Sequence, residues 1–237
     1  MSFQIRRRPF ICTHPPSVLE LRYKDRISNM EKTTAKTACA ILLAGGRSSR
    51  MGKDKAFLEY NGRSLLDIQL EKLCRLDVAE IFISGDPAIY GPHIGTRTFS
   101  GSIQAAGDII PGKGPLGGIM SCMHRSSCSC ALVIGTDIPL IRYETLDILL
   151  KSHLESSDDA TVLSHGSSIE PLIAVYNTDL LPVISDLVRS SRLSVRSLLE
   201  RINVGTFDFC GPADELFNCN TAGDYKDLIE HSASSVS

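Results

Sequence analysis

The sequence lacks an excess of charge of either sign. Its 25 lysines and arginines nearly balance its 27 aspartates and glutamates, which leaves a net charge of −2. Proteins that coat nucleic acid or an anionic membrane depend on a broad surplus of basic side chains. We therefore expect neither nucleic acid nor a membrane among the partners, and any polyanionic ligand must be bound by a local basic cluster.

Long apolar runs are also missing. The longest ones, such as residues 38–45, fall far short of the roughly 20 residues that a membrane-spanning helix needs. With 43% apolar and 22% charged residues, the chain still has enough apolar side chains for a sizeable core. The composition therefore indicates a globular protein without a membrane span.

Cysteine pairs with zinc-site spacing are absent too. None of the eight cysteines forms a C-x2-C pair, although Cys122, Cys128 and Cys130 lie close together with His124 beside them. One interpretation is that these are small buried residues of a protein in a reducing cytosol, which predicts a cytoplasmic location. The other is a metal-binding cluster built from the three cysteines.

The first 37 residues differ from the rest of the chain. They contain Arg6-Arg7-Arg8, several prolines and no periodic pattern, and they lack the uninterrupted apolar stretch of a secretory signal. We interpret residues 1–37 as a disordered extension or a misassigned start upstream of Met30. Residues 38–231 are expected to form one domain, because an α/β protein of about 200–250 residues commonly folds as one unit, and residues 232–237 a tail.

From residue 38 onward, short apolar runs alternate with stretches of helical periodicity. The apolar runs predict buried strands at 39–44, 80–84, 131–135, 160–163 and 169–176. The last two flank a turn at 165–168 and predict an antiparallel hairpin. Strands alternating with helices predict an α/β fold, a three-layer sandwich whose mostly parallel sheet carries the added hairpin. Ligands of such folds bind at the carboxyl ends of the strands.

A glycine-rich loop follows the first predicted strand. Gly45 and Gly46 allow backbone N–H groups to approach a phosphate chain closely. The spacing matches neither the Walker A loop nor the dinucleotide-binding fingerprint. Five basic residues lie in or just after this loop: Arg47, Arg50, Lys53, Lys55 and Arg63. Such a local surplus suits a triphosphate, and the alternative is a solvated basic turn.

Carboxylates follow two other predicted strands. Asp137 stands after the run at 131–135, where a hard oxygen ligand can hold Mg²⁺ against phosphate oxygens. Asp108 stands in a similar place, ahead of the glycine-rich stretch 112–118, which is either a backbone surface for a flat base or a plain loop. Asn218-Cys219-Asn220-Thr221 leads into a predicted helix and includes its N-cap. Each carboxylate also has the simpler interpretation of a turn residue.

These motifs, taken in order, resemble those of the molybdenum cofactor guanylyltransferase family. The likeness spans residues 40 to about 229, and its first block is the most specific. The matching motifs are Leu43-Ala44-Gly45-Gly46-x-Ser48-x-Arg50-Met51-Gly52-x-Asp54-Lys55, Gly114-Pro115-Leu116-Gly117-Gly118, Thr136-Asp137-Ile138-Pro139, Glu170-Pro171-Leu172 and Asn218-x-Asn220-Thr221.

The resemblance implies a Rossmann-like nucleotidyltransferase domain over residues 38–231. It would transfer GMP from GTP to molybdopterin, form the guanine dinucleotide cofactor and release pyrophosphate. Molybdenum insertion proteins and acceptor molybdoenzymes are the implied protein partners. The implied roles are nucleotide binding for Leu43, Ala44, Gly45, Gly46, Ser84 and Asp108, stabilisation of pyrophosphate by Arg50 and Lys55, binding of GTP and the cofactor Mg²⁺ by Asp137, and pterin binding by Glu170, Asn218 and Asn220.

Other functions remain open at this point. Relatives with a similar loop transfer CMP to molybdopterin or build nucleotide-sugars and CDP-alcohols, although Gly46 and the Gly-Pro-Leu-Gly-Gly stretch favour GTP by family resemblance. A domain that binds nucleotide or cofactor without turnover, as an adaptor for a molybdoenzyme, is a second class. The presence of Lys55 and Asp137 argues for an enzyme.

Overall fold

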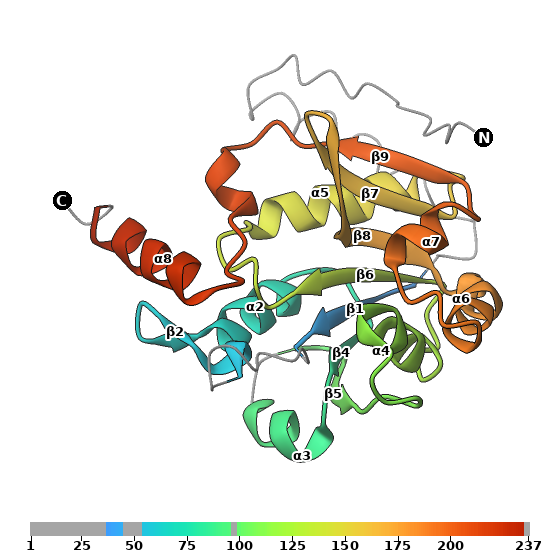
Figure 1. Ribbon diagram of the computed structural model, residues 1–237, viewed down its shortest axis with the longest axis horizontal. Helices are drawn as coiled ribbons and strands as arrows, with labels where there is room; N and C mark the ends of the chain where they lie inside the picture. Colours follow the sequence, from blue (N-terminus) through green and yellow to red (C-terminus); the bar gives the residue numbers. More distant parts are fainter. Residues whose placement is uncertain (1–36, 45–53, 96–98, 235–237) are drawn as a thin grey trace.

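A seven-stranded sheet forms the centre of the molecule (Figure 1). The structure, a computed structural model, describes residues 37–44, 54–95 and 99–234. In this part of the chain the strands of the sheet lie in the order β5-β4-β1-β6-β8-β7-β9. Their bounds are β1 (Ala38–Leu43), β4 (Glu80–Ser84), β5 (Ser102–Ala106), β6 (Cys130–Gly135), β7 (Ala160–His165), β8 (Ser168–Asn177) and β9 (Val204–Asp208).

Helices cover both faces of this sheet, as Figure 1 shows. Helices α2 (Leu65–Cys74) and α5 (Tyr143–Leu154) pack on one face, and α4 (Gly114–Met123), α6 (Leu181–Arg189) and α7 (Val195–Leu199) pack on the other. The predicted three-layer α/β sandwich is confirmed. The remaining elements are the small hairpin β2 (Glu59–Tyr60) and β3 (Arg63–Ser64), helices α3 (Pro87–Tyr90) and α8 (Ala222–Ser234), and the 3-10 turns η1 (Lys55–Phe57), η2 (Gly91–His93), η3 (Thr178–Leu180) and η4 (Ala213–Leu216).

Strand β1 illustrates why the predicted strands read as continuous apolar runs. Ala40 and Leu42 point into the core beneath α2 and α5, whereas Cys39 and Ile41 point into the core beneath α4 and α6. All four are fully buried. A strand covered on both faces has no solvent-facing positions, so it does not alternate between apolar and polar residues.

The predicted antiparallel hairpin is present as β7 and β8. Strand β8 runs antiparallel to both of its neighbours, β6 and β7, and the other pairings of the large sheet are parallel. The structure adds a detail: β8 lies inside the sheet, and β9 pairs parallel to β7 beyond it. The hairpin is therefore an integral part of the core.

A β-bulge interrupts the β7–β8 ladder. Val162 pairs with Ala174, but the next residue of β7, Leu163, pairs with Glu170, so residues 171–173 have no partner in this ladder. Pro171 falls within the bulge, where its missing N–H costs no ladder hydrogen bond. The buried Tyr176 hydroxyl donates to the Pro171 carbonyl at 2.6 Å and fixes the bulge. Bulges of this kind re-aim side chains beside functional sites.

The strand order reverses its direction at β1. From β1 the chain moves outward to β4 and β5, then returns to the opposite side of β1 to form β6. The carboxyl ends of β1 and β6 therefore border a crevice of the type in which doubly wound folds bind their ligands. Leu43 ends β1 and Asp137 follows β6, so two of the predicted site residues lie at this reversal.

The glycine-rich stretch 112–118 is largely helical. Helix α4 begins at Gly114, and Gly118 lies in its first turns, directly against β4. A Cβ on Gly118 would stand 2.3 Å from the Ser84 Oγ. This glycine therefore permits close packing of a helix on a strand, in place of the plain loop that was one of two interpretations.

Candidate active site

The carboxyl ends of β1, β4 and β6 are held together by backbone hydrogen bonds. The Ala44 amide donates to the Ser84 carbonyl, and the Thr136 amide donates to the Leu43 carbonyl, both at 3.2 Å. Ser84 and Ala44 are buried. Leu43, Ala44 and Ser84, predicted to line the nucleotide, are thus neighbours. Gly45, Gly46 and Arg50 fall outside the described residues.

One tyrosine joins the two ends of the glycine-rich loop. The Tyr90 hydroxyl, on α3, lies 3.0 Å from the Ala44 carbonyl and also hydrogen-bonds Asp54 Oδ2. The other Asp54 oxygen accepts from the Ala56 amide at 3.1 Å and caps η1. The Tyr90 ring fits there because residue 85 is glycine: a Cβ would lie 2.1 Å from the ring. The loop therefore starts and ends at fixed points.

Lys55 and Asp137 are close enough for their charges to interact. Lys55, in η1, donates from Nζ to Asn220 Oδ1 at 2.9 Å, across 165 residues of sequence. Partial burial raises the pKa of the Asp137 carboxyl, and the Lys55 charge acts against that rise. A cation, an amide oxygen and a carboxylate from three distant segments thus converge at the carboxyl edge of the sheet.

Asn220 is free to bind Lys55 because another residue caps helix α8. The Asp224 amide donates to Thr221 Oγ1 at 3.2 Å, while Asp224 Oδ2 accepts from the amides of Asn220 and Thr221. This reciprocal arrangement is a capping box, with Thr221 as the N-cap. The predicted cap is therefore confirmed at Thr221, and the Asn220 side chain points to the site.

A set of contacts that sequence reasoning missed holds the Asp137 loop in place. From α2, Gln69 Nε2 donates to the Ile138 carbonyl and Lys72 Nζ donates to the Pro139 carbonyl, both at 2.6 Å. On the other side, the Cys219 amide donates to the Asp137 carbonyl at 2.7 Å. The sequence carries one sign of these contacts: Gln69 stands among leucines on the buried face of α2, where a polar side chain needs a hydrogen-bond partner.

Glu170 lies close enough to Asp137 for the two carboxylates to interact electrostatically. Burial and the negative charge of Asp137 both raise the pKa of the Glu170 carboxyl, and His165 partly offsets this effect. The bulge that begins after Glu170 sets this position. Two carboxylates near one another in a partly buried site are an oxygen-rich environment suited to a hard divalent cation.

Asp108 and Asn218 lie at the margins of this arrangement. Asp108 is exposed after β5, as predicted, and burial raises the pKa of its carboxyl while Arg125 lowers it. Asn218 is exposed in the segment that leads to Asn220. The structure thus brings together Lys55, Asp137, Glu170 and Asn220, with Leu43, Ala44 and Ser84 at the adjoining strand ends.

The three cysteines singled out in the sequence do not form one cluster. Cys130 belongs to the core under α2 and α5, whereas Cys122 and Cys128 belong to the core on the opposite face. Within the described residues, the metal-ligating groups that gather are instead Cys39, Glu80 and Cys128. In the same part of the chain, no helix has the length and apolarity to cross a membrane.

Comparisons with known proteins agree with this geometry. Residues 40–205 match the family model of the MobA-like NTP transferase domain. The chain is 33% identical over 201 residues to a protein named "Probable molybdenum cofactor guanylyltransferase" from Bacillus subtilis, covering 82% of this chain and 96% of the relative. It is 32% identical over 199 residues to the molybdenum cofactor guanylyltransferase of Rhizobium meliloti, covering 77% and 86%.

A solved structure shares the fold. The crystal structure of molybdopterin-guanine dinucleotide biosynthesis protein A from Archaeoglobus fulgidus superposes with a TM-score of 0.69, at 22% identity, over 84% of this chain and 100% of the other. The family model matches most of the domain, and the two sequence relatives are more than 30% identical to this chain. The chain therefore belongs to the MobA-like NTP transferase family of nucleotidyltransferases, in the molybdenum cofactor guanylyltransferase group.

Proposed function

We propose that this protein transfers GMP from GTP to molybdopterin, forming the guanine dinucleotide cofactor and releasing pyrophosphate. The observation that supports this proposal most directly is the meeting of Lys55, Asn220 and Asp137 at the strand reversal. Family membership supplies the reaction class, and the names of the relatives point to the guanylyl transfer.

The chemistry needs attack by the terminal phosphate of the pterin on the α-phosphorus of GTP. A bond forms between that phosphate oxygen and the α-phosphorus, and the bond to the β-phosphate breaks. No covalent protein intermediate is required, so positioning and charge neutralisation supply the rate. In this proposal Lys55 and Arg50 neutralise the leaving pyrophosphate, and Leu43, Ala44, Gly45, Gly46, Ser84 and Asp108 bind the nucleotide.

Mg²⁺ fits the donor set at the strand ends. Asp137 and Glu170 present carboxylate oxygens, the ligands this ion prefers, and their mutual repulsion is relieved by a bound divalent cation. We assign Asp137 as the ligand, and the ion would neutralise phosphate charge there. Glu170, with Asn218 and Asn220, would border the pterin: Glu170 belongs to β8, which lies on the far side of β6 from β4 and β5, and Asn220 contacts Lys55.

The proposal is tested by substrate choice. The purified protein is incubated with Mg²⁺, molybdopterin and one of GTP, CTP, ATP or UTP, and pyrophosphate and the dinucleotide product are measured. We expect turnover with GTP. Release with CTP alone would assign the protein to cytidylyl transfer, and no release with any nucleotide would overturn the enzymatic proposal.

Replacing Asp137 by asparagine tests the metal role. Because Asn keeps the shape but removes the charge that binds the cation, kcat should fall by roughly 100-fold or more. The matched control is Asp186→Asn on α6, an exposed aspartate paired with Arg201, which should keep wild-type activity. Full activity of Asp137→Asn would remove this residue from the proposed metal site.

A further inference from the structure

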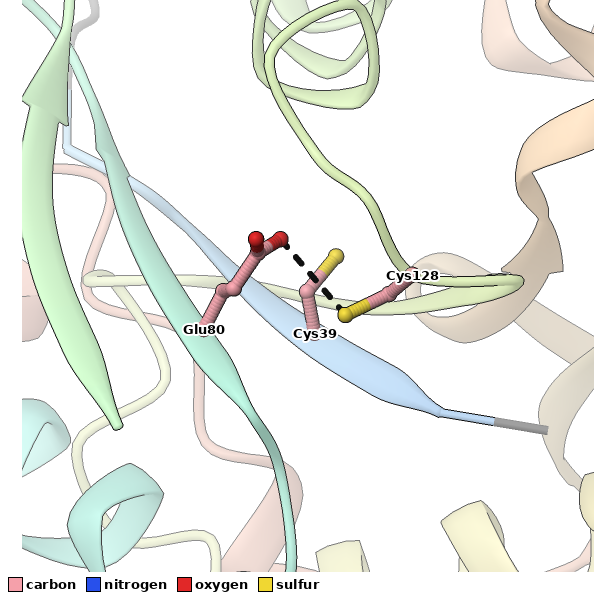
Figure 2. Close-up of side chains that lie close together, drawn as sticks. All are labelled: Cys39, Glu80 and Cys128. Atoms are coloured by element: carbon pink, nitrogen blue, oxygen red, sulfur yellow. Dashed lines mark hydrogen bonds between the residues drawn. The ribbon is translucent and has the colours of Figure 1, made fainter. Parts of the chain in front are cut away.

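A second group of polar side chains lies at the opposite end of the sheet. Cys39 of β1 and Glu80 of β4 are direct partners in the parallel ladder, so both side chains project from the same face. Cys128, in the segment between α4 and β6, approaches them from the right in Figure 2. One ligand atom from each of the three lies within 4.8 Å of the other two.

We propose that Cys39, Cys128 and Glu80 form a zinc site with one coordination position left to water. Zn²⁺ takes four ligands at about 2.3 Å from sulfur and 2.0–2.2 Å from oxygen, which places neighbouring ligand atoms roughly 3.5 Å apart. The Cys128 Sγ lies 3.5 Å from Glu80 Oε2. This pair already has the required spacing, and the other pairs, which lie within 4.8 Å, need to close by about 1 Å at most to occupy three corners of a tetrahedron.

The carboxylate of this group is held in position by neighbouring residues. Ser126 Oγ donates to Glu80 Oε2 at 2.6 Å, and Ser127 Oγ donates to Oε1 at 2.9 Å. The Ser126 hydroxyl also accepts from the Cys128 amide at 3.1 Å, which links the third ligand to the same support. Ligands oriented by such outer hydrogen bonds lose little freedom when they bind a metal.

The remaining coordination position would face water. Cys39 and Cys128 are buried, but Glu80 is only partly buried and Ser127 is exposed, so solvent reaches the edge of the group. The Cys128 thiol already contacts the Glu80 carboxylate, 3.5 Å from its Oε2. Zinc binding would displace both thiol protons to solvent and leave two thiolates, one carboxylate and one water around the ion.

The ligand chemistry separates this site from the catalytic one. Thiolates select zinc over Mg²⁺, whereas Asp137 and Glu170 offer only oxygen. The two sites are also remote from each other, since Cys39 begins β1 and Leu43 ends it, a separation of about 13 Å along the strand. The ion would therefore tie β1, β4 and the segment before β6 together without entering the transfer reaction.

The test is zinc binding by the full-length protein. The chain is purified under reductant, stripped with chelator and titrated with ZnSO₄, and bound metal is measured by elemental analysis. Co²⁺ then serves as a spectroscopic substitute, because sulfur ligands give a charge-transfer band and tetrahedral geometry gives strong visible bands. We expect one ion per chain, both Co²⁺ features and a higher melting midpoint with metal.

Variants assign the ligands. Cys39→Ser, Cys128→Ser and Glu80→Gln should each weaken zinc binding at least 10-fold, with the sulfur band reduced in the two serine variants. Cys130→Ser is the matched control, because Cys130 is equally buried but packs on the other face of the sheet. Circular dichroism of each variant checks that it is folded, and Glu80→Gln removes no core sulfur.

Three outcomes would overturn the proposal: stoichiometric zinc in a folded Cys128→Ser protein, less than one ion per five chains after titration, or loss of zinc in Cys130→Ser alone. A disulfide between Cys39 and Cys128 in the reduced preparation, detected by mass spectrometry, would also overturn it.

Discussion

At the scale of single residues, the least expected feature is a partly buried lysine that supports the loop carrying Asp137. Burial, and secondarily the charge of Arg63, lowers the pKa of Lys72 from its ordinary 10.5 to about 8. The side chain nevertheless donates to the Pro139 carbonyl next to Asp137. The protein thus tolerates an unfavourable charge in exchange for a fixed loop position, which is common near functional sites.

Lys72 should give the protein a distinctive pH dependence. Below about pH 8 the lysine is charged in both the folded and unfolded states, so the full cost of burying the charge is present. Between about 8 and 10.5 the folded protein has already lost this proton and the unfolded chain has not. The free energy of unfolding therefore rises with pH in that window, by about 3 kcal/mol at most, and the gain is complete above 10.5.

The measurement is a comparison with Lys72→Met. Urea unfolding of both proteins between pH 7 and 10.5 should show wild type gaining stability relative to the variant as the pH rises. Lys226→Met, which removes an exposed lysine on α8, serves as the control and should track wild type. A constant difference between wild type and Lys72→Met across the window would contradict the assigned pKa.

At the scale of elements, α3 and η1 act as the two anchors of the glycine-rich loop. Tyr90→Phe removes the hydroxyl that reaches both Ala44 and Asp54. We expect a loss of about 1 kcal/mol in unfolding free energy, the usual worth of one hydrogen bond, and a several-fold higher KM for GTP with a smaller change in kcat.

Tyr225→Phe is the matched control for this prediction. Its hydroxyl likewise donates to a backbone carbonyl, that of Glu59, at 2.8 Å, but outside the loop. A similar stability loss with an unchanged KM is expected. If both variants changed KM equally, the anchoring role of Tyr90 would be wrong.

The elements themselves were largely predictable from the sequence. Buried strands such as β1 and β6 appear as apolar runs, because a strand covered on both faces has apolar residues at every position. The bulge after Glu170 was not predictable because it depends on strand register, and the partners of Gln69 were not predictable because they lie about 69 residues away in the sequence. The same holds for Cys39 and Glu80, whose proximity follows from strand register and leaves no trace in sequence spacing.

At the scale of the whole molecule, ligand binding should stabilise the entire domain. A ligand that binds only the folded state adds RT ln(1 + [L]/Kd), about 2.7 kcal/mol at 100 times Kd. Thermal melts with MgGTP should therefore shift upward more than melts with MgCTP. Asp137→Asn should lose the Mg²⁺-dependent part of the shift and keep the nucleotide-dependent part. Equal shifts with both nucleotides would argue against base selection in the binding step.

The position of β8 inside the sheet has a consequence for how the chain is made. During synthesis β6 and β7 emerge before β8, yet neither pairs with the other in the finished sheet, since β8 lies between them. Until β8 is available, the nascent chain carries an open edge on β6, and open edges invite pairing with other chains. The C-terminal half of the sheet can therefore be completed only after β8 has been made, because β7 joins the sheet through β8 and β9 joins it through β7.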